Sequence, residues 1–236
     1  MKEPLVLVPG MMCDARLYGP QVEALSRERS VMVACATQGE RIEEIASDIL
    51  MASPQKFALA GLSMGGIIAM EIMRRAPERV TRIALMDTNA QAETPQTSAG
   101  YEPMIVGVKA GKLDEVMRGF MKPDYLAPGP GRIEVLNLMS EMARALGPEV
   151  FIRQVRALQR RRDQQATLRK CKVPALIMCG AHDRLTPVKR HEFMAELIPY
   201  AKLQVIEEAG HVPTLEAPEQ VTQALRDWME QPFVLQ

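Results

Sequence analysis

Short apolar runs recur along the chain, and most of them are continuous rather than alternating between apolar and polar positions. A short continuous apolar run predicts a strand that is covered on both faces, as the strands of a parallel sheet are. Six such runs lie at residues 5–8, 31–35, 56–60, 82–86, 175–179 and 203–206.

Amphipathic helical patterns separate most of these runs. Residues 40–52, for example, place Ile42, Ile45 and Ile49 on one helical face. Further helices are expected at residues 64–75, 188–198 and 218–230. Strands that alternate with helices predict an α/β fold with a doubly wound, mostly parallel sheet of about six strands.

One long section breaks this alternation. It shows helical patterns and turn signals but no strand, with helices expected near 101–110, 112–122, 132–146 and 148–160. We therefore expect residues 91–170 to form a helical lid inserted between the fourth and fifth strands, and residues 1–90 and 171–236 to form the core. The arginine run at 160–162 is interpreted as the solvated face of a helix.

Composition and charge narrow the range of partners. The chain has 236 residues, of which 47% are hydrophobic and 25% charged, so it can bury a globular core. Its formal net charge is zero, which gives no attraction to nucleic acid or to an anionic membrane and is compatible with a homo-oligomer. A small-molecule substrate is the expected partner.

The cysteines and the start of the chain favour a cytoplasmic location. Cys13, Cys35, Cys171 and Cys179 show no C-x-x-C spacing, and three of them lie in or beside apolar segments. Buried free thiols are therefore expected. The first apolar run is too short for a signal peptide, and no stretch reaches membrane-spanning length.

Residues 61–65 read Gly-Leu-Ser-Met-Gly, between a predicted strand and a predicted helix. A strand that ends at the start of a helix forces Ser63 into a sharp turn, and the flanking glycines avoid side-chain clashes there. Ser63 is then exposed at the strand end, beside helical N–H groups that favour negative charge. The pattern predicts a nucleophilic serine, although an idle serine in a glycine-rich turn has the same pattern.

A serine hydroxyl needs a base to take its proton, and the chain has three histidines. His211 follows the sixth run, on a loop at the same sheet edge as Ser63, so it is the expected base. His191 lies within the helical pattern at 188–198 and is interpreted as a surface residue. His182 is given no catalytic role.

The base needs an acid that fixes its tautomer and stabilises the imidazolium. Asp183 lies on the loop after the fifth run, and Asp87 ends the fourth. Both lie at the correct sheet edge. Asp183 is the favoured acid because of the loop that carries it, whereas Asp87 is expected to cap or anchor the start of the lid.

Three motifs, taken in order, resemble the α/β-hydrolase fold family over nearly the whole chain. They are Gly-x-Ser-Met-Gly-Gly, Gly-x-x-Asp-x-x-x-Pro and Gly-His-x-x-x-x-Glu-x-Pro-Glu, in the family's Ser, Asp, His order. The resemblance implies Ser63 as nucleophile, Asp183 as acid and His211 as base. It also implies an oxyanion hole formed by the backbone amides of Met11 and Met64.

The chain departs from the family pattern in three places. Pro9 replaces the histidine that usually begins the oxyanion loop. The second strand is followed by Ala-Thr-Gln-Gly-Glu rather than Asp-x-x-Gly-x-Gly, and the family's leading antiparallel strands are missing. These departures weaken the transfer of a substrate from better-known relatives, but they remove no catalytic part.

The implied reaction is acyl transfer through Ser63, and the leading substrate is a small or medium, apolar carboxylic ester. The same triad also supports carbon–carbon bond hydrolysis or a lyase reaction, and a small-molecule receptor that retains its triad is a further alternative. No cofactor is expected, and no metal, because the sequence shows no ligand cluster.

Methionine is frequent, with 17 residues. Those near the expected site either line an adaptable apolar pocket or fill gaps between the lid and the core. They are Met11, Met12, Met64, Met104, Met117, Met121, Met139 and Met142.

Overall fold

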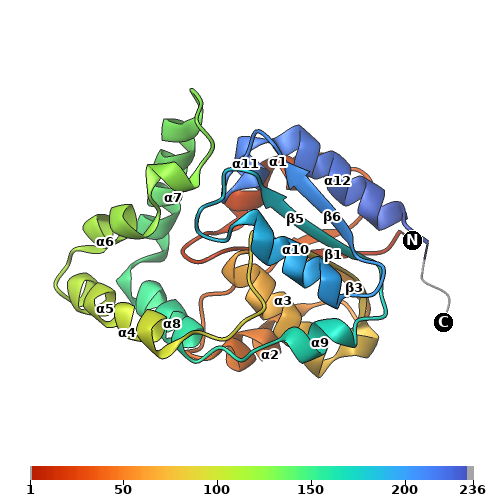
Figure 1. Ribbon diagram of the computed structural model, residues 1–236, viewed down its shortest axis with the longest axis horizontal. Helices are drawn as coiled ribbons and strands as arrows, with labels where there is room; N and C mark the ends of the chain where they lie inside the picture. Colours follow the sequence, from red (N-terminus) through yellow and green to blue (C-terminus); the bar gives the residue numbers. More distant parts are fainter. Residues whose placement is uncertain (1, 233–236) are drawn as a thin grey trace.

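The core of the molecule is a parallel sheet of six strands, seen in the computed structural model, which describes residues 2–232. The strands are β1 (Leu5–Val8), β2 (Val31–Val33), β3 (Phe57–Leu62), β4 (Val80–Met86), β5 (Ala175–Gly180) and β6 (Lys202–Ile206). They lie in the order β2-β1-β3-β4-β5-β6 (Figure 1), and each neighbouring pair is parallel. The chain winds outward from β1 in both directions, so the switch point where such sheets bind ligands lies between β1 and β3.

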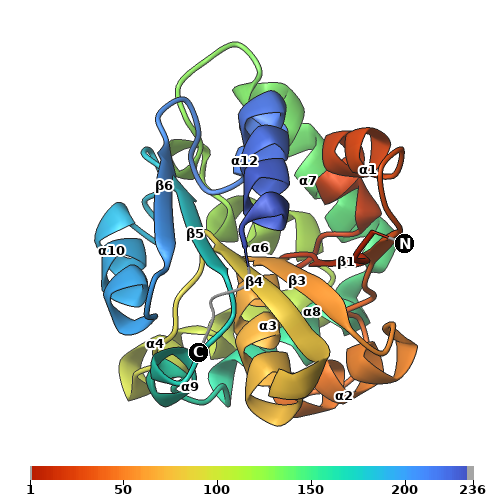
Figure 2. The ribbon, with the colours of Figure 1, turned by 90° about the vertical axis from the view of Figure 1, so that its right-hand side faces the viewer.

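Helices cover both faces of the sheet (Figure 2). Trp228 and Leu25, from α12 (Pro218–Glu230) and α1 (Gly19–Leu25), belong to the apolar cluster of one face. Ile68 and Met194, from α3 (Met64–Arg75) and α10 (Val188–Leu197), belong to the cluster of the other. The side with α3 and α10 also holds α2 (Ile42–Ala52), and α9 (Gln165–Arg169) contacts both α3 and α10.

Each central strand contributes side chains to both apolar clusters. Leu59 and Leu85 lie in the cluster with α3, whereas Ala58 and Ala84 lie in the cluster with α12. Successive side chains of a strand point to opposite faces. A strand with apolar neighbours on both faces therefore needs a continuous apolar run, which explains the pattern in the sequence.

A helical insertion separates β4 from β5, as predicted. It contains α4 (Pro95–Gly100), α5 (Glu102–Lys109), α6 (Leu113–Phe120), η3 (Pro123–Tyr125), α7 (Arg132–Leu146) and α8 (Pro148–Gln159). In Figure 1 these helices lie to one side of the sheet. The division of the chain into a core of 1–90 and 171–236 and a lid domain of 91–170 stays a prediction.

The observed elements differ from the predicted ones mainly at strand ends and in short helices. β2 ends at Val33, and β3 continues to Leu62, which brings Ser63 directly after its last residue. The sequence did not predict α1, α4, α9 or α11 (Pro213–Glu216), nor the single turns η1 (Ala15–Tyr18), η2 (Pro77–Arg79) and η3. Runs this short carry too little periodicity to be recognised.

The four cysteines are free thiols, and Cys35 is exposed whereas the other three are buried. Among residues 2–232, no helix combines the length and the apolar character needed to cross a membrane.

Candidate active site

Ser63 lies in a strained turn between β3 and α3. Its backbone has φ 56° and ψ −118°, a conformation that a residue with a side chain adopts only when its surroundings impose it. The Ser63 N–H donates to the Met86 carbonyl at 2.8 Å, and the Ser63 carbonyl accepts from Gly66 at 2.9 Å. A Cβ atom on Gly65 would lie 2.0 Å from the Val8 carbonyl oxygen, so only glycine permits this approach.

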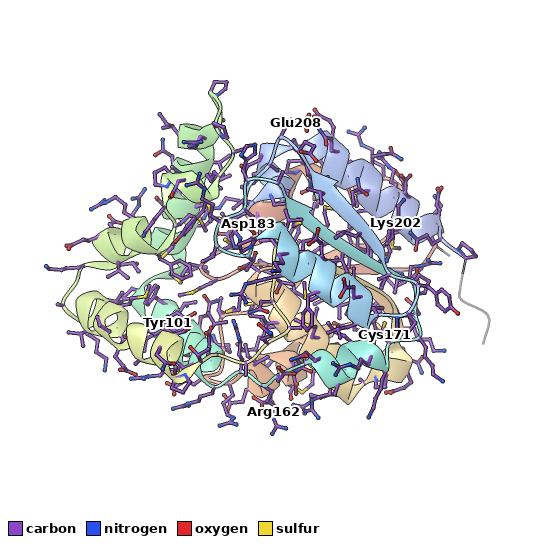
Figure 3. The ribbon with its side chains drawn as sticks, in the orientation of Figure 1. Tyr101, Arg162, Cys171, Asp183, Lys202 and Glu208 are labelled. Carbon is purple, nitrogen blue, oxygen red and sulfur yellow. The ribbon has the colours of Figure 1, made fainter. Side chains whose placement is uncertain are left out.

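His211 reaches Ser63 from the loop after β6. Its Nε2 lies 3.0 Å from the Ser63 Oγ, and its Nδ1 lies 2.8 Å from Asp183 Oδ2. His211 and Asp183 are only 2% and 3% exposed, so little water competes for these contacts. Figure 3 shows Asp183 on the side of the core that faces the insertion.

The loop that carries His211 is fixed by one carboxylate. Glu216 accepts hydrogen bonds from the N–H groups of Gly210 and Val212, each at 2.9 Å, and from Ala127 at 2.7 Å. The His211 N–H itself donates to the Tyr125 carbonyl at 2.8 Å. Glu216 therefore connects the loop of His211 to the segment after α6.

Neighbouring groups keep the carboxyl group of Asp183 ionised. Burial alone would raise the pKa of this carboxyl, but His211 beside it and hydrogen bonds from Thr186 outweigh burial and lower the pKa. The carboxylate also accepts the N–H groups of Leu185 at 2.8 Å and Thr186 at 2.9 Å. Asp183 is thus ionised at neutral pH and can stabilise a positive imidazole.

Asp87 is close to Asp183 and His211 but differs from Asp183 in its protonation state. Its Oδ1 accepts the Gly180 N–H at 3.0 Å, and one polar atom from each of Asp87, Asp183 and His211 lies within 4.8 Å of the others. Burial, and then the charge of Asp183, raise the pKa of Asp87 well above its usual range. A neutral carboxyl cannot stabilise an imidazolium as Asp183 can, so the geometry favours Asp183 as the acid.

The loop after β1 carries the first predicted oxyanion donor. Gly10 approaches Ser63 so closely that a Cβ atom on it would lie 3.4 Å from the Ser63 Cβ. Met11 and Met64 line the same cavity as Ser63, and Met64 opens α3, whose first N–H groups have no acceptor within the helix. The roles of these two amides stay predictions.

A buried glutamine of the insertion holds this loop. Met12 has a positive φ of 55°, and its N–H donates to Gln154 Oε1 at 2.8 Å. The Gln154 Nε2 in turn donates to the Ala36 carbonyl at 2.8 Å. α8 thereby fixes the loops after β1 and β2 together, a contact that no sequence motif indicated.

The interpretation of His191 as a surface residue is wrong. The side chain is fully buried, and its Nε2 accepts the Thr88 N–H at 2.9 Å. Thr88 Oγ1 donates to the Ser63 carbonyl at 2.7 Å, so His191 supports the turn that supports Ser63. Burial lowers the pKa of His191 to about 4, which keeps the imidazole neutral and able to accept this bond. The helical pattern around His191 gave no sign of its buried partner.

A cavity of about 230 Å³ lies on one side of Ser63. Ile67 and Leu158 contribute apolar walls, and Arg161, Glu93 and Tyr101 also line it. Figure 3 shows Tyr101 on the insertion. The cavity is therefore shared between the core and the helices after β4.

The arginine run at 160–162 is not the uniform solvated helix face that was expected. α8 ends at Gln159, and the Arg161 and Glu93 side chains, only 10% and 7% exposed, form an ion pair at 3.1 Å. Arg162 remains exposed, at 60%, and points outward (Figure 3). Arg161 turns inward because the helix has ended.

Similarity to known proteins extends over nearly the whole chain. The model of the family described as "Alpha/beta hydrolase family" matches residues 5–224. The chain is similar to a pimeloyl-[acyl-carrier protein] methyl ester esterase of Photobacterium profundum, with 27% identity over 197 residues, covering 81% of this chain and 77% of that protein. It is also similar to the protein of the same name from Vibrio parahaemolyticus, with 22% identity, covering 96% of this chain and 94% of that protein.

Among solved structures, the chain is similar to a thermophilic esterase from Thermogutta terrifontis, with a TM-score of 0.88 and 26% identity, covering 97% of this chain and 90% of that one. An enol-lactonase from Burkholderia xenovorans LB400 has a TM-score of 0.86 and 22% identity, covering 98% of this chain and 92% of that one.

Proposed function

Because this chain belongs to the alpha/beta hydrolase family, we propose that it is a serine hydrolase that cleaves carboxylic esters through an acyl-enzyme. The observation that carries the proposal is the hydrogen-bonded series from Ser63 through His211 to the ionised Asp183. The names of the similar proteins, which include methyl ester esterases and a thermophilic esterase, support an ester as the substrate.

In the first step the Ser63 Oγ attacks the ester carbonyl while His211 Nε2 takes its proton. The bond between Oγ and the carbonyl carbon forms, and the carbonyl oxygen becomes an anion that the amides of Met11 and Met64 receive. His211 then gives its proton to the ester oxygen as the bond between carbon and that oxygen breaks, which releases the alcohol.

In the second step water attacks the carbonyl carbon of the acyl-enzyme while His211 takes a proton from the water. The bond between Ser63 Oγ and that carbon then breaks, His211 returns the proton to Oγ, and the carboxylic acid is released. Asp183 remains ionised throughout and stabilises the imidazolium. Each oxyanion donor contributes on the order of 3 kcal/mol to lowering the barrier.

The substrate class follows from the cavity beside Ser63. Its volume of about 230 Å³ and its apolar residues near Ser63 suit a small or medium acyl group. The charges of Arg161 and Glu93 pair with each other, and the third charged residue of the lining, Arg190, is exposed to solvent, so no buried, unpaired charge in the lining favours an ionic substrate. We therefore propose an uncharged, largely apolar ester.

The test is hydrolysis of methyl esters of increasing acyl-chain length, followed as acid release, by the wild type, Ser63→Ala and Ser47→Ala. Ser47 is half-buried on α2, and its hydroxyl donates to the Glu43 carbonyl one turn earlier in the same helix, so its variant is the matched control. We expect turnover in the wild type and in Ser47→Ala, and none in a folded Ser63→Ala. Retention of turnover by Ser63→Ala would refute the proposed nucleophile. Failure of the wild type to cleave any ester would favour carbon–carbon hydrolysis, a lyase or a receptor.

A further inference from the structure

Two cavities meet at Ser63, and their sizes differ greatly. The main cavity has about 230 Å³, whereas the second has only about 10 Å³. Ser63, Met11 and Phe120 line both, so the two cavities lie next to each other at the reacting hydroxyl. Of the two, His211 lines only the small one.

The side on which His211 lies determines where the alcohol must leave. The proton that His211 Nε2 carries goes to the ester oxygen of the departing alcohol. That oxygen must therefore be on the His211 side of Ser63, and the alcohol carbon bonded to it extends into the small cavity. A space of roughly 10–15 Å³ holds a single water molecule, so the cavity as it stands fits little more than a methyl group.

Two methionines of the insertion are among the residues that line this small cavity. Met121 follows α6 and Met139 lies on α7, and they are 7% and 6% exposed. Both also line a third cavity, of about 420 Å³, along α6 and α7. The two thioether side chains therefore separate the reacting centre from a much larger space.

We propose that Met121 and Met139 restrict the alcohol part of the ester to a methyl-sized group, while the acyl part occupies the main cavity. This inference rests on the proposed ester hydrolysis at Ser63. The substrate class that it defines is a short-alcohol ester of a larger, apolar acyl group. Removal of either methionine side chain joins the small cavity to the cavity behind it and admits longer alcohols.

The experiment uses two ester series and follows acid release by titration at constant pH. In the first, hexanoate is esterified with methanol, ethanol, butanol or hexanol. In the second, methanol is fixed and the acyl chain grows. For the wild type we expect kcat/KM to fall at least about tenfold from the methyl to the butyl ester, because one methylene that does not fit an apolar pocket costs about tenfold or more.

Met139→Ala should raise kcat/KM for the butyl ester relative to the methyl ester at least about tenfold and leave the acyl-chain profile unchanged. Met121→Ala is a second route to the same opening if Met139→Ala fails to fold. Met139→Leu nearly conserves the volume and should keep the wild-type profile. Met104→Ala removes a half-buried methionine of α5 that lines none of these three cavities and serves as the matched control.

Three results would overturn the inference while leaving ester hydrolysis intact. The wild type would cleave butyl and methyl esters equally, or both alanine variants would retain the wild-type ratio, or the acyl-chain profile would change in place of the alcohol profile. A folded wild type that cleaves no ester of either series would instead overturn the proposed function, and this inference with it.

Discussion

The contact between Gln154 and the loop after β1 gives a prediction that links the insertion to catalysis. Gln154→Ala removes the acceptor of the Met12 N–H and the donor to the Ala36 carbonyl. Gln154 is 1% exposed and Ala36 is 3% exposed, so little water replaces the lost partners. A buried polar group left without its partner costs about 1–3 kcal/mol, so two such groups lower the free energy of unfolding by roughly 2–6 kcal/mol.

Activity should fall as well, because Met12 is the neighbour of the predicted oxyanion donor Met11. Complete loss of one donor costs about 10²–10³ in kcat, so this range is the upper limit for a loop that has lost its support. We expect kcat to fall more than KM rises, because the oxyanion forms only after the substrate is bound. Gln159→Ala, which removes another hydrogen-bonded glutamine of α8, is the control.

Gln154→Glu gives a signature that a merely structural role would not produce. A protonated Glu side chain at this position can accept from Met12 and donate to Ala36, as the glutamine does, whereas an ionised one cannot donate. Burial raises the pKa of such a carboxyl. Activity relative to wild type should therefore decline as the pH rises and this carboxyl ionises. Two results would refute this role of Gln154. One is a folded Gln154→Ala with wild-type kcat, and the other is an activity of Gln154→Glu, relative to wild type, that does not depend on pH.

Three further predictions concern buried titratable groups. Asp183→Asn should lower kcat by about 10⁴. Asp87→Asn should lower kcat no more than about tenfold, because a neutral Asp87 contributes hydrogen bonds and no charge. If steady-state kinetics show the larger loss for Asp87→Asn, Asp87 is the acid instead. The pKa of His191 falls from 6.5 to about 4 on folding, so the unfolded chain binds more protons between these values and stability should drop by roughly 3 kcal/mol as the pH falls from 6.5 to 4. Urea unfolding of wild type and His191→Gln across this range should show a smaller drop in the variant, and parallel curves would contradict the assignment. Arg161→Met should destabilise the protein by up to about 3–5 kcal/mol, since it leaves the buried Glu93 carboxylate without a positive partner and with the Tyr101 hydroxyl as its donor. Adding Glu93→Gln should recover part of that loss in thermal unfolding.

The sheet could be predicted from the sequence because strands buried on both faces need continuous apolar runs. The helix from Met64 to Arg75 and the position of Ser63 followed from the glycine-flanked turn, whose geometry few other residues allow. His211 and Asp183 could be expected near Ser63 because parallel strands bring their following loops to one edge. Their catalytic roles stay predictions until activity is measured.

The features that the sequence did not predict depend on contacts between distant segments. Gln154 reaches Met12 across 142 positions of the chain, and His191 reaches Thr88 across 103. A polar residue in a helical pattern looks the same whether it faces water or a buried backbone group. Arg161 was misinterpreted for the same reason, because its neighbours in sequence are exposed and only its distant partner, Glu93, shows that it turns inward.

The central claim is that Ser63 carries the acyl group, and the most direct test is to isolate that intermediate. Wild-type protein mixed with methyl hexanoate and quenched in acid within the first turnovers would be digested and analysed by mass spectrometry. We expect the peptide containing Ser63 to gain the mass of the acyl group, and the corresponding peptide of Ser63→Ala to gain nothing. Ester hydrolysis with no adduct on Ser63, together with undiminished turnover by Ser63→Ala, would contradict it.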